Sequence, residues 1–302
     1  MSNTVSIAAC NFAVRPVASF DEFAAHVRGM LDGAEGAELV LFPELFTVEL
    51  FTTFPDWKES SSSELTRIDK YTAEYRSLFQ SEAKERSQYI VGGSHLVEVD
   101  GRFLNIGHLF GPDGGVIEHV KTHIFPAEAD WQTEEGDSIE VIELPFAKVG
   151  FNICYEAEIP ECAATLVEQG AEIILCPSFT FTEYGFWRVR HCAQARAIEN
   201  QVYFVHCCTG GQPGSPLPNG WAQSSILSPC DVPWTPNGIV AQAEANREMV
   251  VRGEVDLDKL HENRDDGVAP TFRDRRRRRD LYNAWPSHLS GATSTVSSAT
   301  TL

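Results

Sequence analysis

The fold of this chain is decided by two closely similar stretches, Gly36-Ala37-Glu38-Leu39-Val40-Leu41-Phe42-Pro43-Glu44 and Gly170-Ala171-Glu172-Ile173-Ile174-Leu175-Cys176-Pro177-Ser178. Each is a short apolar run between Gly and Pro, a pattern typical of a buried β-strand. A strand and a helix are predicted before each stretch, and a long helix and another apolar strand after it, so the chain contains two β-α-β-α-β units. Such strands need cover on both faces. The sequence therefore predicts an α/β fold, a four-layer α-β-β-α sandwich with internal pseudo-twofold symmetry.

Length and composition predict one domain. The 302 residues, 43% of them hydrophobic, can fill one large core, and we assign residues 1–286 to it. Ser, Thr and Ala dominate residues 287–302, which predicts a disordered tail. We see no secretory leader and no apolar run of about 18 residues, so we expect a cytoplasmic protein without a membrane span.

The charge of the chain bears on its partners. A net charge of -19 argues against nucleic acids and anionic membranes, because both require a positive surface. The basic run Arg273-Asp274-Arg275-Arg276-Arg277-Arg278-Arg279 has two interpretations. It is either a nucleic-acid or localisation patch, or a local arm paired with the acidic remainder of the chain, and we favour the arm.

The cysteines are expected to be reduced thiols. There are eight of them, with no C-x-x-C pair and no regular spacing. A zinc site would have to use residues of two apolar runs in which alternate side chains point to opposite faces, so we expect no metal. Those residues are His191, Cys192, His206, Cys207 and Cys208.

Polar residues that are candidates for catalysis follow three predicted strands. Glu44 comes after Phe42-Pro43, Lys121 after the second strand of a hairpin, and Cys154 after the run 149–153. Ligands of α/β sheets bind beyond the carboxyl ends of strands. Burial raises the pKa of a carboxyl toward the range of a general base. A nearby ammonium and the start of a helix would lower the pKa of the Cys154 thiol and favour the thiolate.

One mechanism joins these residues. Cys154 would attack a carbonyl or nitrile carbon, while Lys121 and the backbone N–H of Tyr155 hold the oxyanion. Glu44 would pass the thiol proton to the leaving amine and later activate water against the thioester. Glu128, shortly after Lys121, is a candidate for orienting the lysine or the departing nitrogen.

Two further sets of residues are candidates for the site. A histidine base is the competing arrangement, although none of the candidates follows a strand end with a clear orienting partner. These candidates are His123, His191 and His206. Three aromatic residues are candidates for lining an acyl pocket: Phe46, Tyr184 and Trp187.

These residues resemble the nitrilase superfamily of carbon-nitrogen hydrolases. The match covers roughly residues 5–285 and runs over Phe42-Pro43-Glu44, Lys121-Thr122-His123-Ile124-Phe125-Pro126-Ala127-Glu128, and Ile153-Cys154-Tyr155-Glu156 with Pro160-Glu161. The resemblance implies the α-β-β-α fold and a triad of Glu44, Lys121 and Cys154. It also implies a second glutamate at Glu128, no metal or other cofactor, and homodimers or larger homo-oligomers.

The chain departs from parts of the family pattern. Nitrile-cleaving members usually carry Cys-Trp-Glu, whereas Cys154-Tyr155-Glu156 looks more like the amidase and carbamoyl-cleaving branches. Ala157-Glu158-Ile159 stands where an arginine often precedes Pro160-Glu161, which leaves a substrate carboxylate clamp unsupported. Residues 184–190 and 280–282 look similar to a branch in which some members follow an acetyltransferase domain, for which we expect no room before Val5.

Our first hypothesis is a hydrolase of a small non-peptide C–N bond, an amide or ω-amide, which acts through a Cys154 thioester and releases ammonia or an amine. An N-carbamoyl amine hydrolase or a nitrilase with the same triad is an alternative. A catalytically silent oligomeric scaffold and an acyltransferase are alternatives of other classes. The loops that would shape the pocket, residues 46–63, 129–138 and 210–221, leave the physiological substrate open.

Overall fold

A computed structural model describes residues 3–283 of the chain. The predicted tail, residues 287–302, lies outside the described residues. No helix within residues 3–283 is both long enough and apolar enough to span a membrane.

Both halves of the chain contain the predicted β-α-β-α-β unit. The first consists of β1 (Thr4–Ala13), α1 (Phe20–Gly33), β2 (Leu39–Leu41), α2 (Thr72–Arg86) and β3 (Tyr89–Val99). The second consists of β8 (Lys148–Phe151), α4 (Pro160–Glu168), β9 (Ile173–Phe179), α5 (Glu183–Asn200) and β10 (Tyr203–Gly210). The strands of each unit are parallel, in the orders β3-β2-β1 and β10-β9-β8. Gly36 and Gly170, which open the repeated stretches, both have positive φ, at 80° and 102°, a conformation that glycine adopts without strain.

Antiparallel strands extend both units in the same way. In the first sheet, β4 (Arg102–Phe110) and β5 (Val116–Val120) continue beyond β3, and β13 (Met249–Asp256) lies beyond β1. In the second sheet, β11 (Ser225–Leu227) and β12 (Ile239–Gln242) continue beyond β10, and β7 (Val141–Glu143) lies beyond β8. The short strand β6 (Thr133–Glu134) pairs with β4. The sheets join where the end of β1 meets β10, with Phe12 opposite Thr209.

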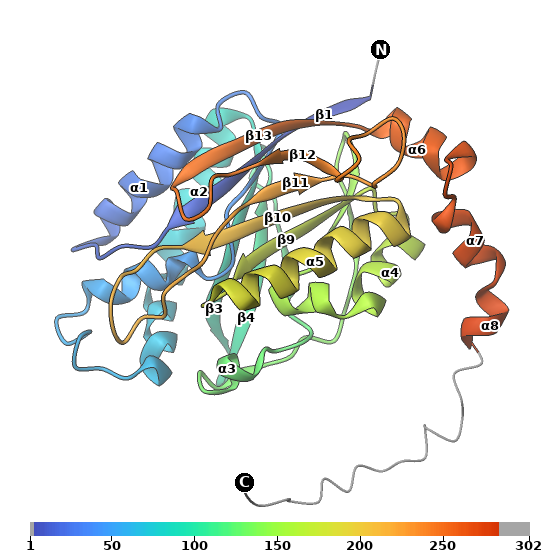
Figure 1. The fold of residues 1–302 in the computed structure, drawn as a ribbon. Helices are drawn as coiled ribbons and strands as arrows, with labels where there is room; N and C mark the ends of the chain where they lie inside the picture. The colour runs from blue at the N-terminus through green and yellow to red at the C-terminus, as the bar shows by residue number, and fades with distance from the viewer. Residues whose placement is uncertain (1–2, 284–302) are drawn as a thin grey trace, which may run out of the picture.

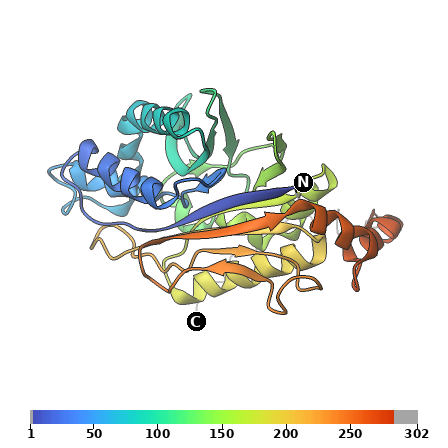
Figure 2. The same ribbon diagram turned by 90° about the horizontal axis from the view of Figure 1, so that it is seen from above.

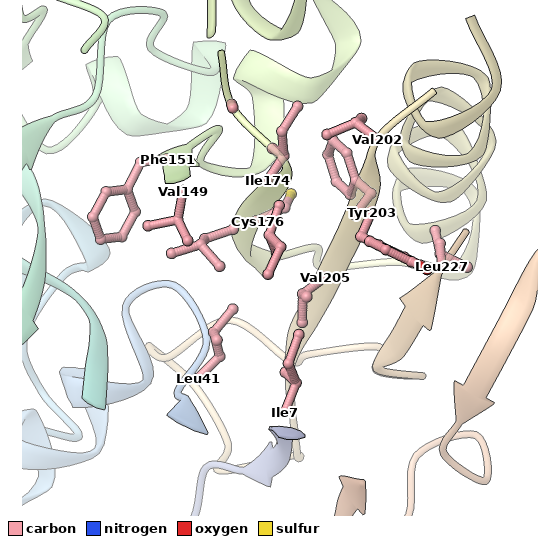
Figure 3. Close-up of a cluster of buried hydrophobic side chains, with 14 of the residues drawn as sticks. Ile7, Leu41, Val149, Phe151, Ile174, Cys176, Val202, Tyr203, Val205 and Leu227 are labelled. Carbon is pink, nitrogen blue, oxygen red and sulfur yellow. The ribbon is translucent and has the colours of Figure 1, made fainter. Parts of the chain in front are cut away.

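The two sheets face one another, and helices cover their outer faces. In Figure 2 the blue and teal helices of the first half lie on one side of the strands and the yellow α5 on the other. Leu41 of β2 packs between the sheets with Val149 of β8 and Val205 of β10 (Figure 3). The neighbouring Val40 belongs instead to the core under α1 and α2. This alternation along a strand that is covered on both faces confirms the predicted four-layer sandwich.

The structure differs from the prediction between β2 and α2. Residues 46–63 were predicted as a loop that leads into one long helix. The chain instead forms two 3₁₀ helices, η1 (Phe46–Thr53) and η2 (Ser62–Tyr71), before α2. The Asp69 side chain accepts hydrogen bonds from the Thr72 hydroxyl and from the Glu98 backbone N–H, at 3.0 and 2.9 Å. Such side-chain hydrogen bonds compete with helical ones, and here they accompany the break between η2 and α2.

The chain after β13 forms the helices α6 (Leu257–Asp266), α7 (Thr271–Arg277) and α8 (Arg279–Asn283). The basic run lies on α7 and α8, along the outside of the second half (Figure 1). Arg276 donates to the backbone oxygen of Val167 at 2.9 Å, and Arg279 pairs with Glu168 at 2.5 Å. The run is therefore a local arm against the end of α4, as predicted.

Candidate active site

Glu44 follows β2 and is only 2% exposed. Its Oε2 accepts the backbone N–H of Phe179 at 2.8 Å, and its own carbonyl accepts the Thr209 hydroxyl at 2.5 Å. These partners belong to β9 and β10, so the catalytic candidate of the first sheet is fixed by the second. The next residue, Leu45, has φ of 48°, a left-handed conformation that turns the chain sharply into η1.

Lys121 lies directly after β5 and is fully buried between two carboxylates. Its Nζ donates to Oε1 of Glu44 at 2.7 Å and to Oε2 of Glu128, which lies on the short helix α3 (Pro126–Ala129). The amide of Asn105, on β4, donates to both carboxylates, at 3.0 Å to Glu44 and 2.8 Å to Glu128. The structure thus brings Glu44, Lys121 and Glu128 together. Asn105 was missed by sequence reasoning, and its signal was one polar residue within the apolar run 103–106.

Burial and charge shift the pKa values of these groups in a way that keeps Lys121 protonated. Burial is the largest influence on the pKa of Glu44 and raises it, against the opposing effect of the Lys121 ammonium. Burial alone would lower the pKa of Lys121, but Glu128 and Glu44 raise it above its ordinary value. The buried ammonium of Lys121 is thus held in its charged form between the two carboxylates.

Cys154 begins the 3₁₀ helix η3 (Cys154–Glu158) and has φ of 47°. A left-handed backbone costs a residue with a Cβ about 1–2 kcal/mol, so the surrounding structure must hold this turn in place. The Sγ atom lies 3.9 Å from the backbone oxygen of Phe179, the residue whose N–H binds Glu44. Cys154, Glu44 and Glu128 line one small recess of about 20 Å³.

The protonation of Cys154 in the resting protein differs from the prediction. Burial, followed by the Glu44 carboxylate, raises the pKa of the Cys154 thiol well above its ordinary value, and Lys121 opposes this shift without overcoming it. The prediction from the sequence included the effect of Lys121 on the pKa of the Cys154 thiol but not the effects of burial and of Glu44. This shift favours the thiol over the thiolate, so a base would have to remove the proton for Cys154 to act as a nucleophile.

A cavity of about 200 Å³ opens onto Cys154. Four aromatic residues form part of its wall: Phe125, Tyr155, Phe179 and Phe181. Arg188 of α5 and Glu158 also line it, and they form an ion pair at 2.8 Å. The cavity is large enough for a small molecule to place one end against the sulfur.

Comparison with known proteins identifies the family. Residues 6–265 match the family model described as carbon-nitrogen hydrolase. The chain belongs to the carbon-nitrogen hydrolase family. The predicted resemblance to this superfamily is therefore confirmed.

The relatives of this chain include a probable hydrolase and several omega-amidases. It is 38% identical over 288 residues to the probable hydrolase YhcX of Bacillus subtilis, covering 92% of this chain and 55% of YhcX. The chain thus spans about half the length of that relative. It is 33% identical to the omega-amidase NIT2-A of Xenopus laevis, covering 82% of this chain and 86% of the relative.

Solved structures confirm the fold. A carbon-nitrogen hydrolase from Helicobacter pylori has a TM-score of 0.75 at 20% identity, covering 93% of this chain and 98% of that one. The amidase of Nesterenkonia sp. AN1 has a TM-score of 0.73 at 18% identity, covering 94% and 97% of the two chains.

The three residues predicted to line an acyl pocket do not line the cavity beside Cys154, so that prediction was wrong. Phe46 is fully buried in the core under α1 and α2, because η1 folds inward and packs it against Phe12 and Phe42. Tyr184 is 88% exposed on the first turn of α5. Trp187 packs against Phe186 and Trp221 on the outer part of the same helix.

The competing histidine arrangement does not form around Cys154. His123 Nδ1 lies 3.0 Å from the Thr122 hydroxyl and 3.6 Å from Cys162 Sγ. His206 is fully buried against Phe186, and His191 stacks on Trp187.

The residues weighed as zinc ligands do not converge either. Within residues 3–283 no group of three or more His, Cys, Asp or Glu side chains is arranged to hold a metal ion. Cys207 Sγ instead contacts the backbone oxygens of Cys10 and Leu41, whereas Cys208 Sγ lies 3.4 Å from His206.

Proposed function

We propose that this chain hydrolyses the amide bond of a small molecule through a thioester on Cys154 and releases ammonia. The observation that carries the proposal is the placement of Lys121 Nζ between Glu44 and Glu128, with both glutamates and the Cys154 thiol lining one recess. A nucleophile, a base and a fixed cation within one buried site match the needs of acyl transfer.

The acylation step follows from these positions. Cys154 Sγ attacks the amide carbon and its proton passes to Glu44, so that the C–S bond forms as the carbonyl π bond opens. The negative oxygen is stabilised by the Lys121 ammonium and the backbone N–H of Tyr155. The protonated Glu44 then donates to the amide nitrogen, the C–N bond breaks, and ammonia leaves. Glu128 keeps Lys121 charged and in place throughout.

Deacylation reverses the roles with water in place of the thiol. Glu44 removes a proton from water, and the resulting hydroxide attacks the thioester carbon. The C–S bond breaks, the Cys154 sulfur recovers its proton from Glu44, and the carboxylic acid departs. The raised pKa of Glu44 suits a group that alternates between base and acid near neutral pH.

The substrate class is supported by the relatives and by the cavity. Omega-amidases and an amidase are among the similar proteins. The aromatic wall beside Cys154 fits a short acyl chain, and the small volume excludes a folded peptide chain. We therefore propose short aliphatic amides and ω-amides as substrates.

The test is ammonia release by the purified protein beside its Cys154→Ala variant. The panel contains short aliphatic amides, ω-amides of dicarboxylic acids, N-carbamoyl amines and a few nitriles. We expect release from an amide by the parent and none by the variant. Release that persists in Cys154→Ala, or release confined to nitriles or carbamoyl compounds, would overturn the proposal.

A further inference from the structure

Glu156 occupies a central place in the molecule without a part in the chemistry described above. It lies on η3, two residues after the nucleophile, and its side chain is 1% exposed. A buried carboxylate is costly unless its oxygens are fully hydrogen-bonded. Its partners therefore show what the structure gains from it.

The partners of Glu156 come from both sheets. Oε1 accepts the backbone N–H of Thr122 at 2.7 Å and the Thr122 hydroxyl at 2.6 Å. Oε2 accepts the backbone N–H of Ile153 at 2.5 Å. Thr122 directly follows Lys121 at the end of β5 in the first sheet, whereas Ile153 directly precedes Cys154 after β8 in the second. One carboxylate thus holds the backbone next to both catalytic candidates.

A histidine completes this arrangement. His119 Nε2 lies 3.1 Å from each oxygen of Glu156, and its ring stacks on Phe151 of β8 with the planes 4° apart. The hydrogen bonds that Glu156 accepts therefore come from donors on both sheets. Charged acceptors make the stronger class of hydrogen bond, so these contacts fix the separation of the two strand ends.

We propose that Glu156 is a positioning residue that keeps Lys121 and Cys154 in register across the two sheets. It does so by pinning the backbone of Thr122 and Ile153. The left-handed turn at Cys154 needs such support, because its backbone would relax toward a commoner conformation if Ile153 were released. This role deepens the proposed function and rests on it for the identity of the reaction.

The variant that tests the proposal is Glu156→Gln. A carboxamide has the same shape but only one acceptor oxygen, so its NH₂ group must face either the Ile153 N–H or the Thr122 donors. One of the two anchors is then lost. We expect kcat to fall about 10²-fold, similar to the loss of one oxyanion donor, with KM changed by less than about threefold. Glu156→Asp keeps two acceptor oxygens and is expected to recover at least about tenfold of that loss.

A second readout is independent of the substrate. The alkylation of Cys154 by iodoacetamide, followed by peptide mass spectrometry, reports on the thiol and its base even if no amide is turned over. We expect about a tenfold slower reaction at pH 7 in Glu156→Gln, because the sulfur is no longer held beside Glu44. The matched control is Glu161→Gln, an exposed glutamate on α4, which should leave both readouts unchanged.

The outcomes separate this proposal from the proposed function. A parent protein that releases no ammonia would overturn the function, while the alkylation rates would still test Glu156. Alkylation and kcat within about threefold of the parent in Glu156→Gln would overturn the positioning role. Two further outcomes would also overturn it, because each would indicate a purely structural effect. In the first, Glu156→Gln regains its activity when it is assayed below its unfolding temperature. In the second, Glu156→Asp fails to recover the lost activity.

Discussion

The ammonium nitrogen of Lys121 lies 2.7 Å from Oε1 of Glu44, although 77 positions separate the two residues in the chain. Both side chains are buried, and Glu128 completes the group on the other side of the ammonium. The site is thus a buried ion triad in which one cation compensates two anions. Such a group is costly to disturb.

Replacing Lys121 by methionine should affect both catalysis and stability. Without the ammonium, we expect a rate loss of at least about 10²-fold to 10³-fold, because an oxyanion donor is removed. Two buried carboxylates then face each other without a cation, which should lower the free energy of unfolding by about 3–5 kcal/mol at pH 7. Part of this loss should be recovered near pH 5, where one carboxyl can be protonated.

Urea unfolding at the two pH values measures the effect on stability. Lys148→Met, which removes an exposed lysine paired with Glu143, is the matched control and should change neither rate nor stability measurably. A Lys121 variant with parental stability at pH 7 would contradict the ion triad.

Replacing Cys154 by serine should abolish nearly all turnover while the fold is retained. A hydroxyl is a far poorer nucleophile than a thiol in a site that lacks a strong base, and the change in size is small. Ammonia release and circular dichroism measure the two effects. Cys230→Ser, at an exposed cysteine, should behave like the parent. Substantial turnover by Cys154→Ser would remove the nucleophile assignment.

Replacing Gly93 by alanine should disturb the strand end that carries Glu44. Gly93 has φ of 65°, and a Cβ there would lie 2.0 Å from the backbone oxygen of Pro43. We expect a loss of stability well beyond the roughly 1–2 kcal/mol of a left-handed alanine, together with a lower kcat.

Gly101 provides the control for this substitution. Its φ is 77°, but a Cβ there would meet no heavy atom within 4 Å. Gly101→Ala should therefore lower the free energy of unfolding only by the cost of a left-handed alanine, and kcat should not change. If urea unfolding gave the same loss of stability for Gly93→Ala and Gly101→Ala, the backbone near Pro43 would have moved to avoid the new Cβ at no cost, which contradicts the prediction.

The stability of the protein should decrease as the pH rises above neutral, because of His26. Its Nδ1 lies 3.0 Å from Glu49 and its Nε2 lies 2.8 Å from Glu248. Burial alone would lower the pKa of His26, but the hydrogen bonds to Glu248 and Glu49 raise it above its ordinary value. A basic group whose pKa is higher in the folded than in the unfolded state stabilises the fold while it is protonated. This stabilisation is complete below the pKa of the unfolded state, about 6.5 for histidine. That stability is lost as the pH rises through the folded pKa.

Urea unfolding between pH 6 and 9 measures this dependence. The decrease attributable to His26 should be on the order of 1 kcal/mol, and His26→Gln should remove it. His261→Gln, at a half-exposed histidine, is the control and should keep the parental slope. A parental slope in His26→Gln would assign the pH dependence to other groups.

The sequence supported the prediction of the layers and of the main site residues for a simple reason. The repeated stretches are bounded by Gly and Pro and have apolar residues on both strand faces, so only a doubly covered sheet suits them. Glu44, Lys121 and Cys154 follow strands, and strand ends of facing sheets meet. The structure brings Glu44 and Lys121 into contact and places Cys154 on the same recess, with Glu128 opposite Glu44.

Other features depend on packing that local sequence does not contain. Asn105 joins the two glutamates from the middle of β4, where nothing but its polarity distinguishes it from its neighbours. The cavity wall includes Phe179 and Phe181 because β9 ends there, whereas Phe46 turns into the core. The raised pKa of the Cys154 thiol follows from burial and from the Glu44 carboxylate, which an argument from strand ends alone could not include.

The repeat has a consequence for how the molecule can work. Glu44 and Ser178 hold the same place in the two copies, and the N–H of Phe179, next to Ser178, binds Glu44. The two copies therefore converge on a single centre, which takes Glu44 and Lys121 from one half and Cys154 from the other. Neither half holds the proposed nucleophile together with the proposed base. Turnover by this chain would thus report the docking of its two halves, and a molecule with one half unfolded would have no residual activity.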